Sequence, residues 1–132
     1  MVAVDLPDQV LAQMNRERGL TVLVENFGWM QDDSNAIPAL IKAVGAKNVV
    51  LHLDTFHMNI EEKNQAAAIK KAGPLLAHFH ACGTDRGTPG NDSLDWKPIV
   101  SALRKIGYKQ DVVIESFTTD VKVIARAAAI WR

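Results

Sequence analysis

The sequence has one cysteine, no excess of charge of either sign and no long run of apolar residues. Cys82 alone cannot build an internal disulfide framework, and its isolation fits the reducing conditions of the cytoplasm, where we expect the protein to be located. Lys and Arg together number 15, as do Asp and Glu, so the balanced charge indicates neither a nucleic-acid partner nor a membrane partner. The longest apolar runs, such as Ala66–Ile69, are too short to span a bilayer, and no signal peptide is recognisable.

Within its 132 residues the chain repeats a pattern of short apolar runs and amphipathic stretches. The runs are rich in β-branched residues, as is typical of strands covered on both faces in a parallel sheet. We expect a single α/β domain over residues 1–132, because no linker or low-complexity tract divides the chain. The predicted strands are Thr21–Glu25, Asn48–Asp54, Leu75–His80 and Asp111–Glu115.

A helical pattern follows each of these runs. Ile37, Leu40, Ile41 and Val44 form an apolar stripe at helical spacing, which ends at Gly45. In the next segment, Asn59 and Glu62 are spaced like a capping box, which predicts one helix from Asn59 to Ala72. The remaining predicted helices are Trp96–Ile106, Val121–Trp131 and a leading helix over Pro7–Arg18.

Each predicted strand ends in a residue that could bind a metal: Glu25, Asp54, His80 and Glu115. The C-terminal ends of successive strands meet at one edge of a parallel sheet or at one mouth of a barrel, so these side chains should converge. Three carboxylates and one imidazole suit Mn²⁺, Mg²⁺ or Co²⁺ better than an ion that prefers thiolates. Of the three ions we expect Mn²⁺. Taken singly, each acid could instead cap a helix or face solvent, Asp54 could cap a turn, and His80 could be a half-buried structural histidine.

Two neighbouring features have simpler interpretations. Cys82 follows His80 by two positions, but with no second cysteine it is better interpreted as a small loop residue than as a soft-metal ligand. The Gly-, Asp- and Thr-rich segment Cys82–Leu94 is predicted to form a loop that covers the site and excludes water.

Three segments resemble the ketose 3-epimerases that act on D-tagatose and D-psicose, within the sugar-phosphate isomerase/epimerase superfamily of xylose isomerase-like TIM barrels. They are Leu53–Glu62 (LDTFHMNIEE), Ala72–His80 (AGPLLAHFH) and Val112–Phe117 (VVIESF), where the family more often has Pro than Ser116. The resemblance extends from about Thr21 to the C-terminus. It implies a fold that is half of a (β/α)₈ TIM barrel, with four βα units after one helix.

The resemblance also implies roles for individual residues. It identifies Glu25, Asp54, His80 and Glu115 as the metal ligands, and Glu25 and Glu115 also as the catalytic acid/base pair that works on opposite faces of a ketose. It identifies four substrate-binding residues: His57, Arg86, Gln31 and Phe117. Of these, Gln31 stands where the family usually has an acidic residue.

A complete barrel has about 250 residues, so the sheet of this chain needs a cover. A second copy could supply it, other elements could, or the chain could be a fragment. We expect a homodimer. The leading functional hypothesis is a metal-dependent epimerase that removes and returns a proton next to a carbonyl. The alternatives are a keto-acid or inosose isomerase of the same superfamily, and a half-barrel that binds or assembles without catalysis. A nuclease on the same barrel is disfavoured by the neutral charge.

Overall fold

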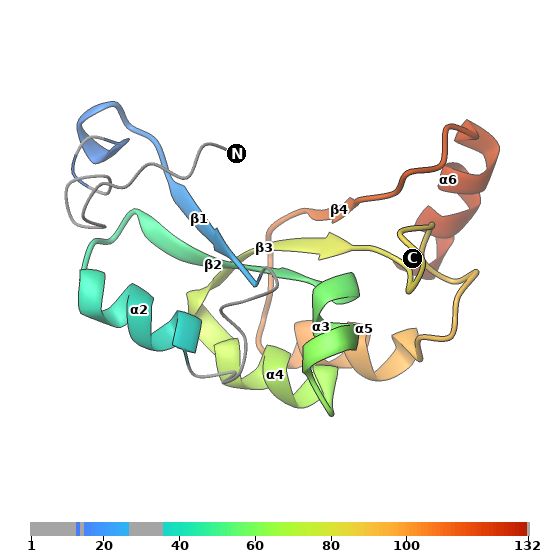
Figure 1. The fold of residues 1–132 in the computed structure, drawn as a ribbon, viewed down its shortest axis with the longest axis horizontal. Helices are drawn as coiled ribbons and strands as arrows, with labels where there is room; N and C mark the ends of the chain where they lie inside the picture. The colour runs from blue at the N-terminus through green and yellow to red at the C-terminus, as the bar shows by residue number, and fades with distance from the viewer. Residues whose placement is uncertain (1–12, 14, 27–35, 132) are drawn as a thin grey trace.

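The computed structural model describes residues 13, 15–26 and 36–131, apart from the side chains of residues 36, 130 and 131. Four parallel strands form one sheet in the order β1-β2-β3-β4 (Figure 1). The predicted α/β architecture with a parallel sheet is therefore confirmed. The leading helix expected over Pro7–Arg18 falls mostly outside the described residues. The strands are β1 (Val22–Glu25), β2 (Val49–Asp54), β3 (Leu76–Ala81) and β4 (Val112–Ile114).

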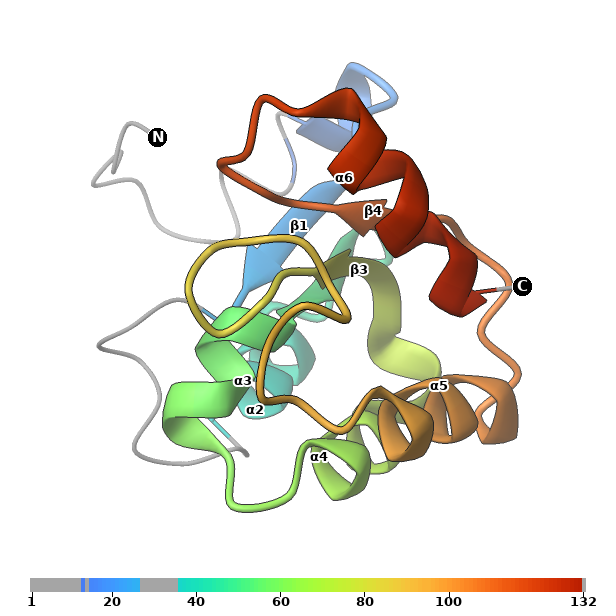
Figure 2. The same ribbon diagram turned by 90° about the vertical axis from the view of Figure 1, so that its right-hand side faces the viewer.

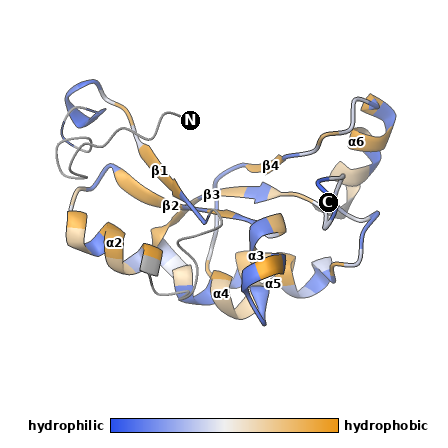
Figure 3. Cartoon of the chain, viewed as in Figure 1, coloured by the Kyte–Doolittle hydropathy of each residue, from blue (hydrophilic) through white to orange (hydrophobic). Residues whose placement is uncertain are grey.

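Helices lie against one face of the sheet. Figure 1 shows α2 (Ala36–Val44), α4 (Gln65–Ala72) and α5 (Trp96–Lys105) on the same side of the strands. Figure 3 colours β1, β2 and α2 mainly as hydrophobic, in keeping with an apolar layer between sheet and helices. That layer is the core, and its largest fully buried side chains include Phe79, Met58 and Ile69.

The opposite face of the sheet is open in the described part of the chain. Because side chains alternate along a strand, the neighbours of the core residues point to this face. Leu23 in β1 and Val113 in β4 lie there and are 43% and 39% exposed. Helix α6 (Val121–Ala127) and the 3₁₀ helix η3 (Ala128–Trp131) stand apart beyond the end of β4 (Figure 1).

The prediction of a single helix over Asn59–Ala72 is wrong. Two helices occupy this region, α3 (Thr55–Glu61) and α4, and Glu62 between them has an extended backbone with φ −104° and ψ 124°. The capping box misplaced the start of the first helix, because Asp54 caps α3 directly at the end of β2. A second cap follows, since the Asn64 side chain accepts a hydrogen bond from the Ala67 N–H and starts α4.

The predicted helix end at Ala72 is confirmed, since α4 ends at this residue. Gly73 has φ 51° and ψ −127°, a backbone conformation that residues with a Cβ rarely adopt. It turns the chain into the short 3₁₀ helix η2 (Gly73–Leu75), which leads into β3.

The strand register aligns the polar residues. Glu25 pairs with His52, His52 with His78, and Asp54 with His80. A register shift between Leu51 and His52 in the β2–β3 pairing puts both histidines of β3 level with polar residues of β2. The C-terminal ends of the strands therefore bring acids and imidazoles together.

Candidate metal centre

The four predicted ligands occupy neighbouring positions at the C-terminal ends of the strands. Glu25 is the last residue of β1, Asp54 the last of β2, His80 the next-to-last of β3, and Glu115 directly follows β4. The Glu115 N–H donates to the Ala81 carbonyl, which extends the β3–β4 pairing by one step. One possible ligand atom from each of Glu25, Asp54 and His80 lies within 4.8 Å of the other two.

Asp54 is fully buried, and its two carboxylate oxygens have different surroundings. Oδ1 accepts hydrogen bonds from the backbone N–H groups of Phe56 (2.6 Å) and His57 (3.4 Å), so the helix cap fixes this side chain. Oδ2 has no hydrogen-bond partner among the described residues. Burial, followed by interaction with the Glu115 carboxyl group, raises the pKa of Asp54 to about 7. A buried oxygen without a donor is what a bound cation would satisfy.

The His80 ring faces the same point. Its Nδ1 is buried without a hydrogen-bond partner in the described structure and lies 3.7 Å from Asp54 Oδ2 and 3.8 Å from Glu115 Oε2. These distances are too long for hydrogen bonds. They match two ligand atoms around one ion, since bonds of about 2.0–2.2 Å hold such atoms no more than about 4.4 Å apart. Burial lowers the pKa of His80, which favours the neutral, ligating form of the ring.

The two predicted acid/base residues have pKa values shifted in opposite directions. Burial, and then the charge of Glu115, raise the pKa of Glu25. Interaction with the Asp54 carboxyl group lowers the pKa of Glu115, and the nearby His80 and Arg86 lower it further. Opposite shifts of this kind separate a proton donor from a proton acceptor within one site.

Arg86 connects the centre to the predicted substrate residues. Its Nη1 donates to Glu115 Oε2 at 2.9 Å, and its Nη2 lies 3.0 Å from His57 Nε2. The guanidinium group stacks over the Phe56 ring at 4.1 Å and lies 5.6 Å from the Phe117 ring centroid. The backbone at Arg86 has φ 60°, an uncommon conformation for a residue with a Cβ, and its carbonyl accepts from the Phe117 N–H.

The predicted substrate residues are thus partly brought together. His57 is buried and contacts Arg86, while Phe117 is 74% exposed at the edge of the group. Gln31 lies outside the described residues. The segment Cys82–Leu94, which contains Arg86, lies between α3 and α6 at the C-terminal ends of the strands (Figure 2).

Cys82 is a fully buried residue directly after β3. Its sulfur and one carboxylate oxygen each of Asp54 and Glu115 lie within 4.8 Å of one another, so the three residues could together hold a metal ion. Burial raises the pKa of its thiol to about 12, so the sulfur carries its proton at neutral pH and is a weak ligand. The Thr55 hydroxyl accepts from the Cys82 N–H and donates to the Cys82 carbonyl, which agrees with a structural position.

Sequence reasoning missed three polar residues close to the centre. Asn26 exchanges two hydrogen bonds with the Asp54 backbone, since its Oδ1 accepts at 2.7 Å and its Nδ2 donates at 3.3 Å. His52 and His78 share the open sheet face with Asp54 and His80. The signal was available, because each histidine lies two positions before a predicted ligand and so points to the same side of its strand.

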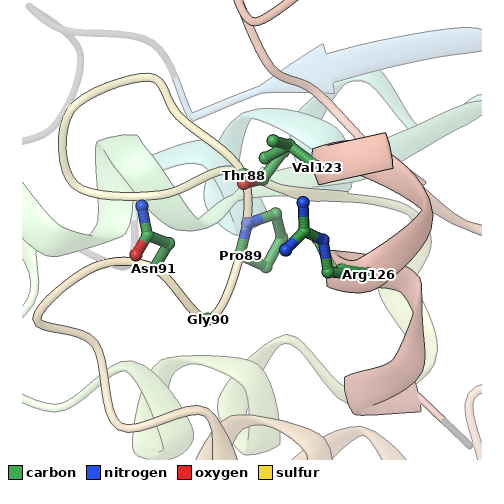
Figure 4. Close-up of a pocket in the computed structure, with 7 residues that line it drawn as sticks. Thr88, Pro89, Gly90, Asn91, Val123 and Arg126 are labelled. Atoms are coloured by element: carbon green, nitrogen blue, oxygen red, sulfur yellow. The ribbon is translucent and has the colours of Figure 1, made fainter. Parts of the chain in front are cut away.

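A separate pocket of about 310 Å³ opens where the segment Cys82–Leu94 meets α6. Figure 4 shows residues that line it, with Thr88, Pro89 and Asn91 on that segment and Val123 and Arg126 on α6. None of the predicted site residues that the structure describes lines it. The pocket is therefore distinct from the candidate metal centre.

A family model described as xylose isomerase-like TIM barrel matches residues 9–132. The chain belongs to this family. Membership of the xylose isomerase-like TIM barrels confirms the predicted partial barrel, of which the parallel four-stranded sheet forms one part.

Curated relatives of the chain are epimerases. It is 45% identical to a D-psicose 3-epimerase of Agrobacterium fabrum over 94 residues, 71% of this chain and 32% of the relative. It is 39% identical to a D-psicose 3-epimerase of Enterocloster bolteae over 114 residues, 86% of this chain and 38% of the relative. The chain thus spans about a third of the length of these relatives.

Solved structures agree with this relationship. A D-allulose 3-epimerase from Methylomonas sp. superposes with a TM-score of 0.77 at 30% identity, over 94% of this chain and 46% of that one. A 3-keto-D-glucoside 4-epimerase from E. coli superposes with a TM-score of 0.83 at 29% identity, over 94% of this chain and 50% of that one.

In the described part of this chain, no helix has both the length and the apolar character needed to cross a membrane.

Proposed function

We propose that this chain supplies the metal-binding part of a ketose 3-epimerase, which inverts carbon 3 by removing a proton and returning one to the opposite face. The observation that carries the proposal is that Glu25, Asp54 and His80 offer ligand atoms within 4.8 Å of one another, with Glu115 Oε2 3.8 Å from His80 Nδ1. Asp54 Oδ2 and His80 Nδ1 are buried and have no hydrogen-bond partner among the described residues. The names of the curated relatives support the same reaction. Since the chain spans about a third of those relatives, the activity is proposed for the complete site.

The donor set fits a divalent cation held by these four residues. Mn²⁺ is the preferred ion, with Mg²⁺ or Co²⁺ as alternatives, because oxygen donors outnumber the single imidazole. When bound, such an ion acts as a Lewis acid that acidifies the C–H bond next to a carbonyl. The helix cap holds Asp54 in place for this role, since its Oδ1 is occupied by backbone donors while Oδ2 remains for the cation.

Glu25 and Glu115 are proposed as the acid/base pair. They sit at the ends of β1 and β4, the two edge strands, and so approach a substrate from different sides. One carboxylate takes the proton from C3 and the other returns a proton from the opposite face, with the roles exchanged for the other epimer. The intermediate between the two transfers is an enediolate.

His57 and Arg86 are proposed to hold the oxygens of the ketose. The Arg86 guanidinium has donors directed at both Glu115 and His57, so a hydroxyl or carbonyl group entering between them would meet a fixed cation. Phe117, exposed at the edge, would provide an apolar wall for the sugar, and Gln31 is proposed as a further substrate contact.

Proton exchange tests the assignment. The chain is incubated with D-psicose and Mn²⁺ in D₂O, and NMR follows deuterium incorporation at C3. Glu115→Gln should abolish exchange even where Mn²⁺ still binds, whereas Glu61→Gln, an exposed site on α3, should exchange like the parent protein. Exchange at the parent rate in Glu115→Gln would show that the acid/base assignment is wrong.

A second candidate reaction is epimerisation at carbon 4 of a keto-sugar. It is favoured by the structural match to the 3-keto-D-glucoside 4-epimerase, whose TM-score is 0.83. The same acids could act on a carbon on the other side of a carbonyl. Offering a 3-keto-glucoside in D₂O distinguishes the two reactions, because deuterium would then appear at C4.

The remaining expectations concern assembly and location. A homodimer that covers the open sheet face, and a cytoplasmic location, stay predictions. If a second copy completes the site, exchange activity should rise more steeply than in proportion to chain concentration.

A further inference from the structure

Three histidines form a cluster on the open sheet face, next to the oxygen-rich centre. The ring centroids of His52 and His78 lie 4.7 Å apart, those of His52 and His80 4.1 Å, and those of His78 and His80 4.9 Å. One ring nitrogen from each lies within 4.8 Å of the other two. Three imidazoles from two adjacent strands therefore converge in one place.

The strands hold this cluster in position. His52 and His78 are register partners on β2 and β3, and His80 follows His78 by two positions, so all three rings leave the sheet on the same side. His52 is 5% exposed, and its Nε2 is buried without a hydrogen-bond partner in the described structure. An imidazole nitrogen buried in this way has lost its contact with water and gained no replacement.

A neighbouring acid favours a cation here. The Glu25 carboxylate lies within ion-pair distance of the cluster, since its Oε2 is 3.9 Å from His52 Nδ1.

We propose that His52, His78 and His80 form a second cation site, selective for imidazole-preferring ions such as Zn²⁺, which shares His80 with the oxygen-rich centre. Three nitrogens with a fourth position open to Glu25 or water suit Zn²⁺, whereas the carboxylate-rich centre suits Mn²⁺. Since one ring cannot serve both ions fully, the two sites compete. Zn²⁺ bound to the histidines draws His80 away from Glu25, Asp54 and Glu115 and weakens the hold on Mn²⁺.

Zinc titration of the full chain, in apo form, tests this site without requiring enzymatic activity. Long-range ¹H–¹⁵N spectra of the four histidines are recorded as Zn²⁺ is added. The ring-nitrogen signals of His52, His78 and His80 should shift together at one equivalent, with a smaller change at His57, which lies outside the cluster. This measurement uses the unaltered chain, so it does not depend on a variant folding.

Variants then separate the two sites by calorimetry. His78→Gln should weaken Zn²⁺ binding at least about tenfold, since the loss of even an outer-shell partner costs about 10–100-fold. The same variant should bind Mn²⁺ within about twofold of the parent, because His78 is not a ligand of the oxygen-rich centre. His57→Gln keeps all three imidazoles of the cluster and is the matched control, with Zn²⁺ affinity close to that of the parent.

The outcomes are distinct. The inference is overturned if Zn²⁺ does not bind, if the His78 signals stay unchanged at one equivalent, or if His78→Gln binds Zn²⁺ like the parent, which would place zinc in the oxygen-rich centre. Zn²⁺ binding that depends on His78 in a chain without Mn²⁺ affinity would support this site while contradicting the proposed epimerase centre.

Discussion

Asp54 and His80 occupy paired positions on adjacent parallel strands, and Asp54 Oδ2 lies 3.7 Å from His80 Nδ1. Both atoms are buried and neither has a hydrogen-bond partner in the described structure. Without a cation, both atoms stay buried without a hydrogen bond. Each unsatisfied group then lowers the stability of the fold by about 1–3 kcal/mol. A shared ion explains why the two atoms face each other.

Asp54 combines two roles that substitution can separate. Asp54→Asn should remove Mn²⁺ binding yet keep the cap of α3, because Asn is as good an N-cap as Asp. In EDTA its melting temperature should equal or exceed that of the parent, since a buried acid is replaced by a neutral amide. Asp54→Ala should lose both the metal and about 1 kcal/mol of cap stability. Calorimetry and thermal unfolding measure the two effects, and strong Mn²⁺ binding by Asp54→Asn would contradict the assignment.

His52 should make the metal-free protein less stable in acid. Its pKa is about 3 in the folded chain and about 6.5 in the unfolded chain, so the unfolded state binds more protons between these values. The free energy of unfolding should therefore fall as pH drops below about 6.5, by up to about 1.4 kcal/mol per pH unit. The groups that face this ring are Glu25, His80, His78, Glu115 and His57.

His52→Gln isolates that contribution, because the other titrating groups, Asp54 with its raised pKa included, remain in both proteins. Urea unfolding at pH 7, 6 and 5 in EDTA should give a shallower pH dependence for the variant than for the parent. Parallel curves would mean that His52 is protonated to the same extent in the folded and unfolded chains.

Arg86 should matter for sugar binding more than for the metal. Arg86→Lys keeps the charge but cannot contact Glu115 and His57 together while stacking on Phe56. Hydrogen bonds to charged groups contribute about 1.5–3 kcal/mol, so affinity for D-psicose should fall roughly 10- to 150-fold. NMR titration measures it in the presence of Mn²⁺. Arg104→Lys, at an exposed position on α5, is the control, and equal sugar affinity in both variants would remove Arg86 from the substrate site.

The parallel sheet and the proximity of the site residues were predictable, because the apolar runs and the pairing rules of parallel strands led to the same arrangement. Each strand run ended in a polar residue, and parallel pairing then placed those ends together, as Asp54 and His80 show. The break between α3 and α4 was not predictable in the same way. Two valid capping signals competed there, and the choice depended on Asp54 folding back onto the Phe56 and His57 N–H groups.

The two histidines beside the metal centre were also not predicted. His52 and His78 stand within apolar runs, where a lone histidine is usually a packed core residue. Their spacing of two positions from Asp54 and His80 puts them on the same sheet face, but only the register shift between β2 and β3 makes them level with each other. Likewise, the bridge from Arg86 to His57 depends on a loop conformation with φ 60° that residue spacing does not encode.

The most direct test is a crystal structure of the chain grown with Mn²⁺, with anomalous data collected at the manganese edge. A single peak should lie between the four strand ends, with oxygens of Glu25, Asp54 and Glu115 and a ring nitrogen of His80 all within about 2.0–2.5 Å. No peak at that position, or a peak whose ligands omit Asp54 and His80, would contradict the metal centre and the epimerase mechanism built on it.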